Sequence, residues 1–239
     1  MLSIVIPTLN EKDYLPRLLE CLRRQSFRNF EVIVADAGSI DGTEEVARAF
    51  GCKVVKGGLP AQGRNRGAKE AQGELILFLD ADVILPDDFL EKTLKEFKER
   101  NLDIATFSLI PLSKKWKTKI LFNFFYNYPL RILQEKWAHG AMGILVKKWL
   151  HQKIGGFDEK IKIAEDHYYV QKGAKIAKFG LIKSTKIYIS LRRIKKEGWV
   201  KIGLKYSFAE LHMKFKGPIK KEYFQYKFGE FKPEDEYWK

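Results

Sequence analysis

The first 85 residues alternate between short apolar runs and amphipathic segments, and this alternation restricts the fold more than any other feature. Apolar runs at 3–8, 30–35, 52–57 and 75–79 have the length and composition of buried strands. The segments 14–26, 43–50 and 60–73 between them are predicted to be helical, with Thr43 capping the second and Gly73 closing the third. This pattern predicts an α/β fold, a doubly wound, mostly parallel sheet with helices on both faces.

The loops that follow these strands carry most of the polar side chains expected to act together. In doubly wound sheets, ligands bind outside the carboxyl ends of the strands. These side chains should therefore converge at one edge of the sheet: Thr8, Asn10, Glu11, Asp36, Gly38, Ser39, Asp41, Asp80 and Asp82. Asp36 and Asp41 have an alternative role as turn and cap residues, which Asp favours.

Asp80 and Asp82 stand one residue apart inside the apolar stretch "LILFLDADVIL". Two neighbouring carboxylates repel each other and are costly to remove from water. A bound divalent cation would offset this cost, because Mg²⁺ and Mn²⁺ prefer oxygen ligands and are often held by one or two carboxylates with substrate phosphates. The sequence therefore predicts a Mn²⁺ or Mg²⁺ site at Asp80 and Asp82.

The later part of the chain is less regular. We expect a helix at 87–100, strands at 102–112 and 140–148, a helix over 164–180, and a strand from 187 that runs into a basic turn. The segment 116–137 is aromatic and basic. It suits core packing, a wall of the acceptor site, or an interfacial membrane element.

The net charge of +14 is concentrated in the second part of the chain. Residues 1–100 carry 15 basic and 17 acidic side chains, whereas residues 101–239 carry 29 and 13. This asymmetry favours an anionic partner, and a solvated lysine-rich surface is the alternative. We expect a main domain at 1–198 and a basic, aromatic extension at 199–239 that packs on it or docks to an anionic membrane surface.

The sequence also predicts where the protein works. No segment reaches the ~18 apolar residues of a membrane span, and the N-terminus lacks the basic region of a signal peptide. Cys21 and Cys52 are expected to be buried free thiols, which fits a reducing compartment. The expected localisation is cytoplasmic or peripheral on the inner face of the cell membrane.

Five motifs occur in order between residues 2 and 173: "SIVIPTLNE", "VIVADAGSIDGT", "GRNRGAKEAQGELILFLDADV", "GGFDE" and "AEDHYYVQKG". This ordered set resembles the family-2 glycosyltransferases, which are inverting, nucleotide-sugar-dependent enzymes with the GT-A fold. The resemblance implies a donor linked to UDP, or alternatively GDP. The acceptor is left open and includes lipid-linked acceptors.

The resemblance also implies roles for individual residues. Asp166 would be the general base that deprotonates the acceptor, and Asp82 would ligate the metal. Asp80 would face the ribose or the metal, and Asp36 would accept hydrogen bonds from the base. The predicted nucleotide-binding set is Pro7, Thr8, Asn10, Glu11, Asp36, Gly38, Arg64 and Asp80.

Several residues near this site have alternative roles. Glu165 competes with Asp166, and because neighbouring helical side chains point ~100° apart, we expect one of them to face the site. His139 is a metal ligand, an acceptor contact or a structural residue. Arg192 and Arg193, in "SLRR", clamp a diphosphate or an anionic acceptor, or lie in a solvated basic turn. The family usually has two aspartates where this chain has Asp36-Ala37.

Two other functions are alternatives to a glycosyltransferase. A sugar nucleotidyltransferase would need a glycine- and arginine-rich phosphate loop after the first strand, and residues 7–16 match this poorly. A nucleic-acid-binding protein would suit the basic and aromatic residues 214–231, but it would not explain the acidic strand ends. We therefore do not expect a nucleic acid partner.

Overall fold

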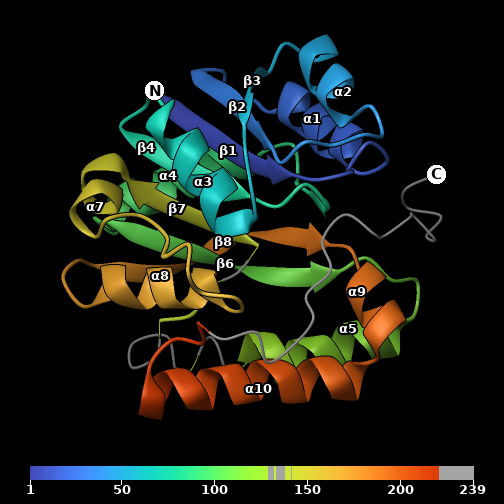
Figure 1. Ribbon diagram of the computed structural model, residues 1–239, viewed down its shortest axis with the longest axis vertical. Helices are drawn as coiled ribbons and strands as arrows, with labels where there is room; N and C mark the ends of the chain where they lie inside the picture. The colour runs from blue at the N-terminus through green and yellow to red at the C-terminus, as the bar shows by residue number, and fades with distance from the viewer. Residues whose placement is uncertain (129–131, 133–137, 141, 221–239) are drawn as a thin grey trace.

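The computed structural model describes residues 1–128, 132, 138–140 and 142–220. Its centre is an eight-stranded sheet in the order β3-β2-β1-β4-β7-β6-β8-β5. Helices cover both faces of the sheet, and α5 and α10 form a further layer at one end of the molecule (Figure 1). The predicted α/β fold, with helices on both faces of the sheet, is thereby confirmed.

The first part of the chain forms the parallel region of the sheet. It contains the strands β1 (Leu2–Thr8), β2 (Phe30–Asp36), β3 (Lys53–Lys56) and β4 (Leu75–Leu79). The helices that connect them are α1 (Leu15–Arg24), α2 (Thr43–Ala49) and α3 (Pro60–Lys69). These strands are apolar and largely buried, so the helices on either face supply the packing that they need.

The second part of the chain adds the mixed region of the sheet. Its strands are β5 (Val83–Ile84), β6 (Ile104–Pro111), β7 (Gly143–Lys147) and β8 (Phe179–Ile189). Its helices are α4 (Phe89–Glu99), α5 (Trp116–Phe122), the π-helix η1 (Asn123–Asn127), α7 (Lys148–Lys153), α8 (Glu165–Ala174), α9 (Arg192–Glu197) and α10 (Trp199–Lys216). β7 runs antiparallel to β4 and β6, whereas β6 and β8 are parallel to each other.

This strand order brings many loops to one edge. Because β6 and β8 run in the same direction as β1, β2 and β4, the ends of all five strands lie at the same edge of the sheet. β7 runs the other way, so its start lies there too. The residues that follow β1, β4 and β8 therefore meet, although β1 ends at Thr8, β4 at Leu79 and β8 at Ile189.

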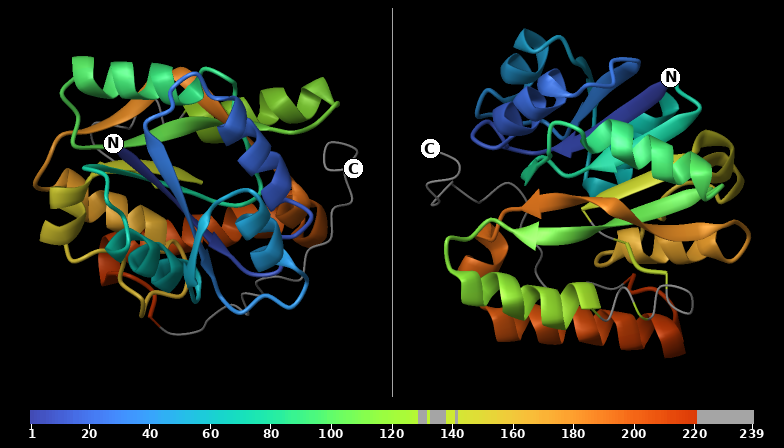
Figure 2. Two further views of the ribbon diagram at one scale, coloured as in Figure 1. Left: turned by 90° about the horizontal axis from the view of Figure 1, so that it is seen from above. Right: turned by 180° about the vertical axis from the view of Figure 1, so that it is seen from behind.

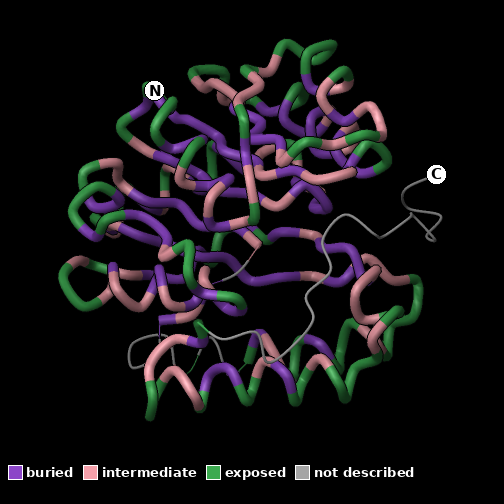
Figure 3. Tube along the Cα trace, in the orientation of Figure 1, coloured by how far each residue is buried: buried purple, intermediate pink, exposed green. Residues whose placement is uncertain are grey.

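Two buried clusters hold the layers together. One joins α1 and α4 to one face of the sheet, and the other joins α3, α7 and α8 to the opposite face (Figure 2). In the second cluster Phe157 stacks on Tyr169 with ring centroids 3.9 Å apart, and Phe78 packs edge-on against both rings. Figure 3 shows that the strands are mostly buried, whereas α10 alternates between buried and exposed residues.

Some local expectations were wrong. Gly42, in a left-handed conformation, precedes α2, and Asp41 accepts hydrogen bonds from the amide and hydroxyl of Thr43. Thr43 is therefore not the cap; its hydroxyl accepts a hydrogen bond from the amide of Glu11 instead. α3 ends at Lys69, before Gly73.

Other expectations concern the thiols and the end of the chain. Cys21 is buried and Cys52 half-buried, and both are free; burial raises the pKa of Cys52 to about 11. The extension begins as α10, where Ala209 packs against Ile163 and Ala164. Residues 221–239 and Trp137 lie outside the described residues. Within the described part of the chain, no helix has the length and apolar content needed to cross a bilayer.

Candidate active site

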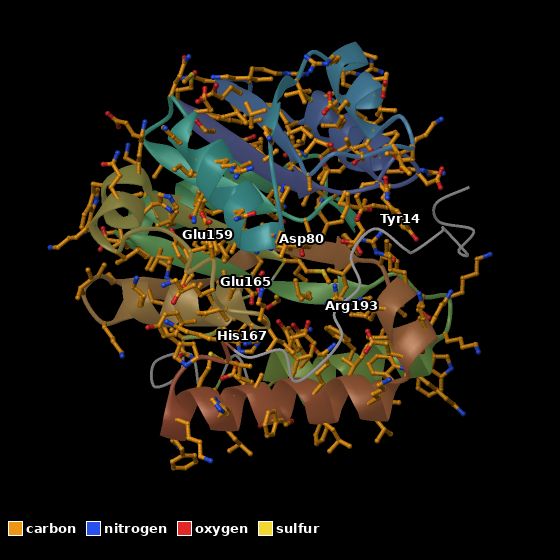
Figure 4. All side chains as sticks on the ribbon, viewed as in Figure 1. Tyr14, Asp80, Glu159, Glu165, His167 and Arg193 are labelled. Carbon is orange, nitrogen blue, oxygen red and sulfur yellow. The ribbon has the colours of Figure 1, made fainter. Side chains whose placement is uncertain are left out.

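A cavity lies at the edge where the strands end, and charged side chains dominate its wall. Loops after β1, β4 and β8 contribute to it, together with the first turns of α3 and α8. Its charged lining residues are Glu11, Asp80, Asp82, Glu165 and Asp166, with Arg64, Arg192 and Arg193. In Figure 4, the labels of Asp80, Glu165 and Arg193 lie in the middle of the view, below α3 and above α10.

Arg64 links two of the carboxylates. This buried guanidinium, on α3, donates to Asp80 over 2.7 Å and to Glu165 over 2.8 Å. It also lies over the ring of Phe157, 5.3 Å from the ring centroid. Burial raises the pKa of Asp80 to about 6, although the charge of Arg64 opposes the shift. The Asp80 carboxylate is therefore ionised at neutral pH at an energetic cost, and Arg64 recovers part of that cost.

Arg192 links two other carboxylates. Its two terminal nitrogens donate to the two oxygens of Glu11 over 2.8 and 2.7 Å, and Nε lies 2.8 Å from Asp82. The short strand β5 follows Asp82 and pairs with the end of β8, which places Arg192 beside it. Burial outweighs this ion pair and raises the pKa of Glu11 to about 7.

The cavity wall carries more negative than positive charge, which a divalent cation could balance. Five carboxylates face three guanidinium groups among the described lining residues, an excess of two negative charges when all are ionised. One oxygen of Asp80 pairs with Arg64, and one oxygen of Asp82 pairs with Arg192. Carboxylate oxygens suit Mg²⁺ or Mn²⁺. The lining residues therefore fit the metal that the sequence predicts, and Asp80 and Asp82 would be the residues to hold it.

Asp166 lies at the start of α8. Ala164 before the helix adopts a left-handed conformation, with φ of 57°, and both Glu165 and Asp166 line the cavity. The expectation that only one of them faces the site was therefore wrong, because the cavity extends around the first turn of the helix. The two still differ: Glu165 is paired with Arg64, whereas one Asp166 oxygen accepts the amide hydrogen of His167.

His139 lies outside the cavity lining, in a buried cluster with His167 and Glu210. Nδ1 of His167 is hydrogen-bonded to the Glu210 carboxylate, and Nδ1 of His139 lies 3.4 Å from the same oxygen. Burial opposes ionisation of Glu210, but the two histidines lower its pKa to about 2. Metal-ligating atom types meet here, yet hydrogen bonds within the cluster already join its charged groups.

Three residues of the predicted nucleotide-binding set lie outside the cavity lining: Asn10, Asp36 and Gly38. The Asp36 carboxylate accepts four hydrogen bonds, from the Thr8 and Ser39 hydroxyls and the amides of Gly38 and Ser39. These donors fill its acceptor positions. Asp36 thus organises the turn after β2, as the alternative reading expected, and Asn10 joins this turn through Ser39 and Ile40.

Sequence analysis missed part of the cavity wall. Tyr206, on α10, lines it, and its hydroxyl accepts a hydrogen bond from Arg193 over 2.9 Å. Residues 58–60, Met142 and Ser190 also contribute. Tyr206 lies in a basic, aromatic helix with no catalytic motif, so no pattern in the chain distinguished it from its neighbours.

Comparison with protein families gives a match to the model described as "Glycosyl transferase family 2" over residues 3–150. An uncharacterised glycosyltransferase from Haemophilus influenzae is 32% identical over 185 residues, which are 72% of this chain and 61% of that protein. Glycosyltransferase GlyG from Streptococcus pneumoniae is 32% identical over 114 residues, 44% of this chain and 38% of that protein. The chain thus spans less than two thirds of the length of these relatives.

Solved structures show the same fold. The structure of Staphylococcus aureus TarS residues 1–349 in complex with UDP aligns with a TM-score of 0.65 and 21% identity, covering 90% of this chain and 72% of that one. The mannosyltransferase PcManGT from Pyrobaculum calidifontis, in complex with GDP-Man and Mn²⁺, aligns with a TM-score of 0.64 and 20% identity. That alignment covers 87% of this chain and 64% of the other.

Proposed function

Since the chain belongs to glycosyl transferase family 2, we propose that it moves a sugar from a nucleoside-diphosphate sugar to an acceptor hydroxyl or phosphate, inverting the anomeric carbon. The observation that carries this proposal is the cavity at the strand ends, where Asp80 and Asp82 face Arg64 and Arg192. Cationic groups beside a carboxylate pair suit a diphosphate held with a divalent metal.

In the proposed reaction, Asp166 accepts the proton of the acceptor as its oxygen attacks the anomeric carbon. The bond from that carbon to the diphosphate oxygen breaks on the opposite face, and the nucleoside diphosphate leaves with the bonding electrons. A bound Mg²⁺ or Mn²⁺ would stabilise the charge of the leaving diphosphate. Arg192 and Arg193 line the cavity, where a diphosphate could reach both.

We propose Asp166 rather than Glu165 as the base because their partners differ. The Glu165 carboxylate is already engaged by Arg64, over 2.8 Å. Within the described residues Asp166 makes no ion pair with an arginine, and the nearby His167 ring nitrogen is 3.8 Å away. Glu165 instead positions Arg64.

We propose UDP as the nucleotide of the donor, with GDP as the alternative. Structures of TarS are described in complex with UDP and UDP-GlcNAc, whereas that of PcManGT is described with GDP-Man. With Asp36 occupied by its own turn, we further propose that backbone groups near Pro7 and Thr8 contact the base, since both residues line the cavity.

The test begins with calorimetric titration of UDP and GDP, with and without Mn²⁺. We expect one diphosphate to bind at least tenfold more tightly with Mn²⁺, and we expect Asp82→Asn to remove this gain. Asp88→Asn is the matched control, because Asp88 is half-buried and pairs with Lys92 on α4. Failure of both nucleotides to bind would contradict the proposal.

Hydrolysis of the bound donor, which is sugar transfer to water, measures the chemical step separately from donor binding. Asp166→Asn should keep donor binding but lower sugar transfer at least a hundredfold, within the range ascribed to general base catalysis. Equal transfer by this variant would exclude Asp166 as the base. Release of pyrophosphate from a nucleoside triphosphate would instead identify a nucleotidyltransferase.

A further inference from the structure

Helix α10 has its polarity reversed with respect to an ordinary surface helix. Its inward face buries Lys205 and Glu210, which are 6% and 8% exposed. Its outward face carries an apolar stripe at helical spacing: Val200, Leu204, Phe208, Leu211 and Phe215. Val200 and Phe215 are 76% and 75% exposed. Surface helices normally turn the apolar side inward, so this exposed stripe is of the kind that marks an interaction surface.

A second apolar stripe lies on α5 and the residues that follow it. Trp116, Ile120, Phe124 and Tyr128 recur at every fourth position, and all are exposed. The ring of Phe122 meets that of Trp199 at the start of α10, with centroids 6.2 Å apart. The two stripes therefore belong to one end of the molecule, where Figures 1 and 2 show α5 and α10 in the same layer.

This end, which we call the α5–α10 face, concentrates the exposed apolar side chains. Of the eighteen large apolar residues exposed in the described part of the chain, twelve lie between 116 and 132 or between 199 and 215. The segment up to η1 is fastened to the sheet by Asn127, whose side chain amide donates to and accepts from the backbone of Leu109 in β6. The stripe is thus held in place rather than loosely attached.

The charges around the α5–α10 face are almost all positive. Residues 112–128 contain four lysines and no acidic residue, and Glu210 is the sole acidic residue between 198 and 217. Glu210 is buried. The exposed lysines near the stripes include Lys115, Lys117, Lys119, Lys201, Lys214 and Lys216.

We propose that the α5–α10 face docks on the surface of an anionic lipid bilayer. Apolar and aromatic residues would enter the interface, and the lysines would meet the lipid headgroups. Residues 112–128 and 199–216 present no exposed acidic side chain. This argues against a second copy of the chain as the occupant, because two such faces would place lysines against lysines. Trp116, Trp199 and Tyr128 are of the residue types enriched where a membrane meets water.

Combined with the proposed function, on which this step rests, the docked face implies an acceptor carried by a lipid. Tyr206 lines the cavity from the inward side of α10, and outward-facing Leu204 and Phe208 stand two residues before and after it. An acceptor anchored in the bilayer would need to cross little more than the width of this helix.

The test is sedimentation of the full chain with vesicles of phosphatidylglycerol or phosphatidylcholine. We expect binding to phosphatidylglycerol at low salt, at least tenfold weaker binding to phosphatidylcholine, and a further loss of binding in 0.5 M salt. The double variant Leu204→Glu, Leu211→Glu should bind at least tenfold more weakly than wild type. The control, Ile40→Glu with Phe50→Glu, makes the same charge change at exposed residues beside α2 and should bind like wild type.

The proposal would be overturned by no sedimentation with anionic vesicles, or by equal binding of the two double variants. A dimer that the Leu204→Glu, Leu211→Glu variant dissociates, without vesicle binding, would assign the face to self-association. Quenching of wild-type tryptophan fluorescence by brominated phosphatidylglycerol, reduced in Trp116→Phe with Trp199→Phe, tests docking without charged substitutions; no quenching would also overturn it. Calorimetric donor binding without vesicles tests the proposed function separately.

Discussion

Arg192 holds Glu11 and Asp82 together, although 71 residues separate the two carboxylates in the chain. It also lies over the ring of Tyr14, with its guanidinium carbon 4.4 Å from the ring centroid. The guanidinium thus uses three nitrogens for carboxylates and its face for an aromatic ring. Lysine cannot reproduce this arrangement, because its ammonium group is a single point charge.

We therefore expect Arg192→Lys to lower kcat/KM for sugar transfer by about tenfold to a hundredfold, the effect of losing one or two charged hydrogen bonds. Steady-state kinetics on the donor measure the effect. Arg48→Lys is the control, because Arg48 makes an exposed pair with Glu44 on α2. Unchanged kinetics for Arg192→Lys would show that charge alone suffices at this position.

The raised pKa of Glu11 predicts a pH dependence of stability. In the folded state the pKa of Glu11 is about 7, against an ordinary value of 4.5, because the side chain is buried. Between these values the folded protein retains a proton that the unfolded chain has released, so stability falls as pH rises. Without divalent metal, we expect Tm to fall between pH 4.5 and 7, and to fall less in Glu11→Gln.

Asp80 contributes in the same direction between pH 3.8 and about 6. Thermal unfolding of the wild type and of Glu11→Gln in EDTA, at matched ionic strength, gives their Tm at each pH. The difference between the two pH profiles isolates Glu11, since the other titrating groups are shared. Parallel profiles would mean that the Glu11 pKa is not raised in the folded protein.

The Glu210–His167 hydrogen bond predicts a pH range in which both side chains contribute to stability. The pKa of Glu210 is lowered to about 2, so its contribution to stability is present above its ordinary pKa of 4.5 and is lost as pH falls toward 2. Burial lowers the pKa of His167, but Asp166 and Glu210 raise it above 6.5, so its contribution is lost at high pH. Both contributions coincide between about pH 4.5 and 6.5.

Glu210→Gln should therefore lose about 1–3 kcal/mol of stability in this window, the cost of breaking a buried charged hydrogen bond. Urea unfolding at pH 5.5 and pH 8.5 measures the loss, which should be larger at pH 5.5. We also expect a shifted pH profile of kcat, because His167 lies beside Asp166. An equal loss at both pH values would contradict the charged pair.

Gly140 provides a test of how precisely Asp166 must be placed. A Cβ atom at residue 140 would lie 2.4 Å from the backbone carbonyl carbon of Asp166, closer than real contacts allow. Gly140→Ala should push the start of α8 away from the cavity and lower kcat at least tenfold. Gly203→Ala, where a Cβ meets open space on α10, should instead stabilise the helix by about 0.5–1 kcal/mol. Kinetics and urea unfolding of both variants decide the matter.

Sequence patterns predicted the parallel region of the fold well, because each strand there is a continuous apolar run that ends in polar residues. The rule for strand ends also placed Glu11, Asp80 and Asp82 near one another, whereas the roles of Arg64 and Asp166 came from the resemblance to family-2 glycosyltransferases. Arg192 could not be assigned a partner in this way. Its contacts with Glu11 and Asp82 depend on the pairing of β5 with β8, a two-residue strand that has no periodic signal.

The same limit applies to His139 and Tyr206. His139 has no metal-ligand spacing with His167 or Glu210, and their meeting depends on where α10 packs. The four hydrogen bonds of Asp36 were equally hidden, because Asp in a turn after a strand fits both a ligand contact and an internal anchor.

Helix α10 has one further consequence. Tyr206 projects to the cavity from one face, and Leu204 and Phe208 project outward from the other. When a rigid helix rotates about its own axis, its two opposite faces move in opposite directions. Whatever seats the outer side chains would therefore also set the position of Tyr206. One helix would thus serve both the proposed docking and the cavity wall, and we expect truncation before Trp199 to remove both at once.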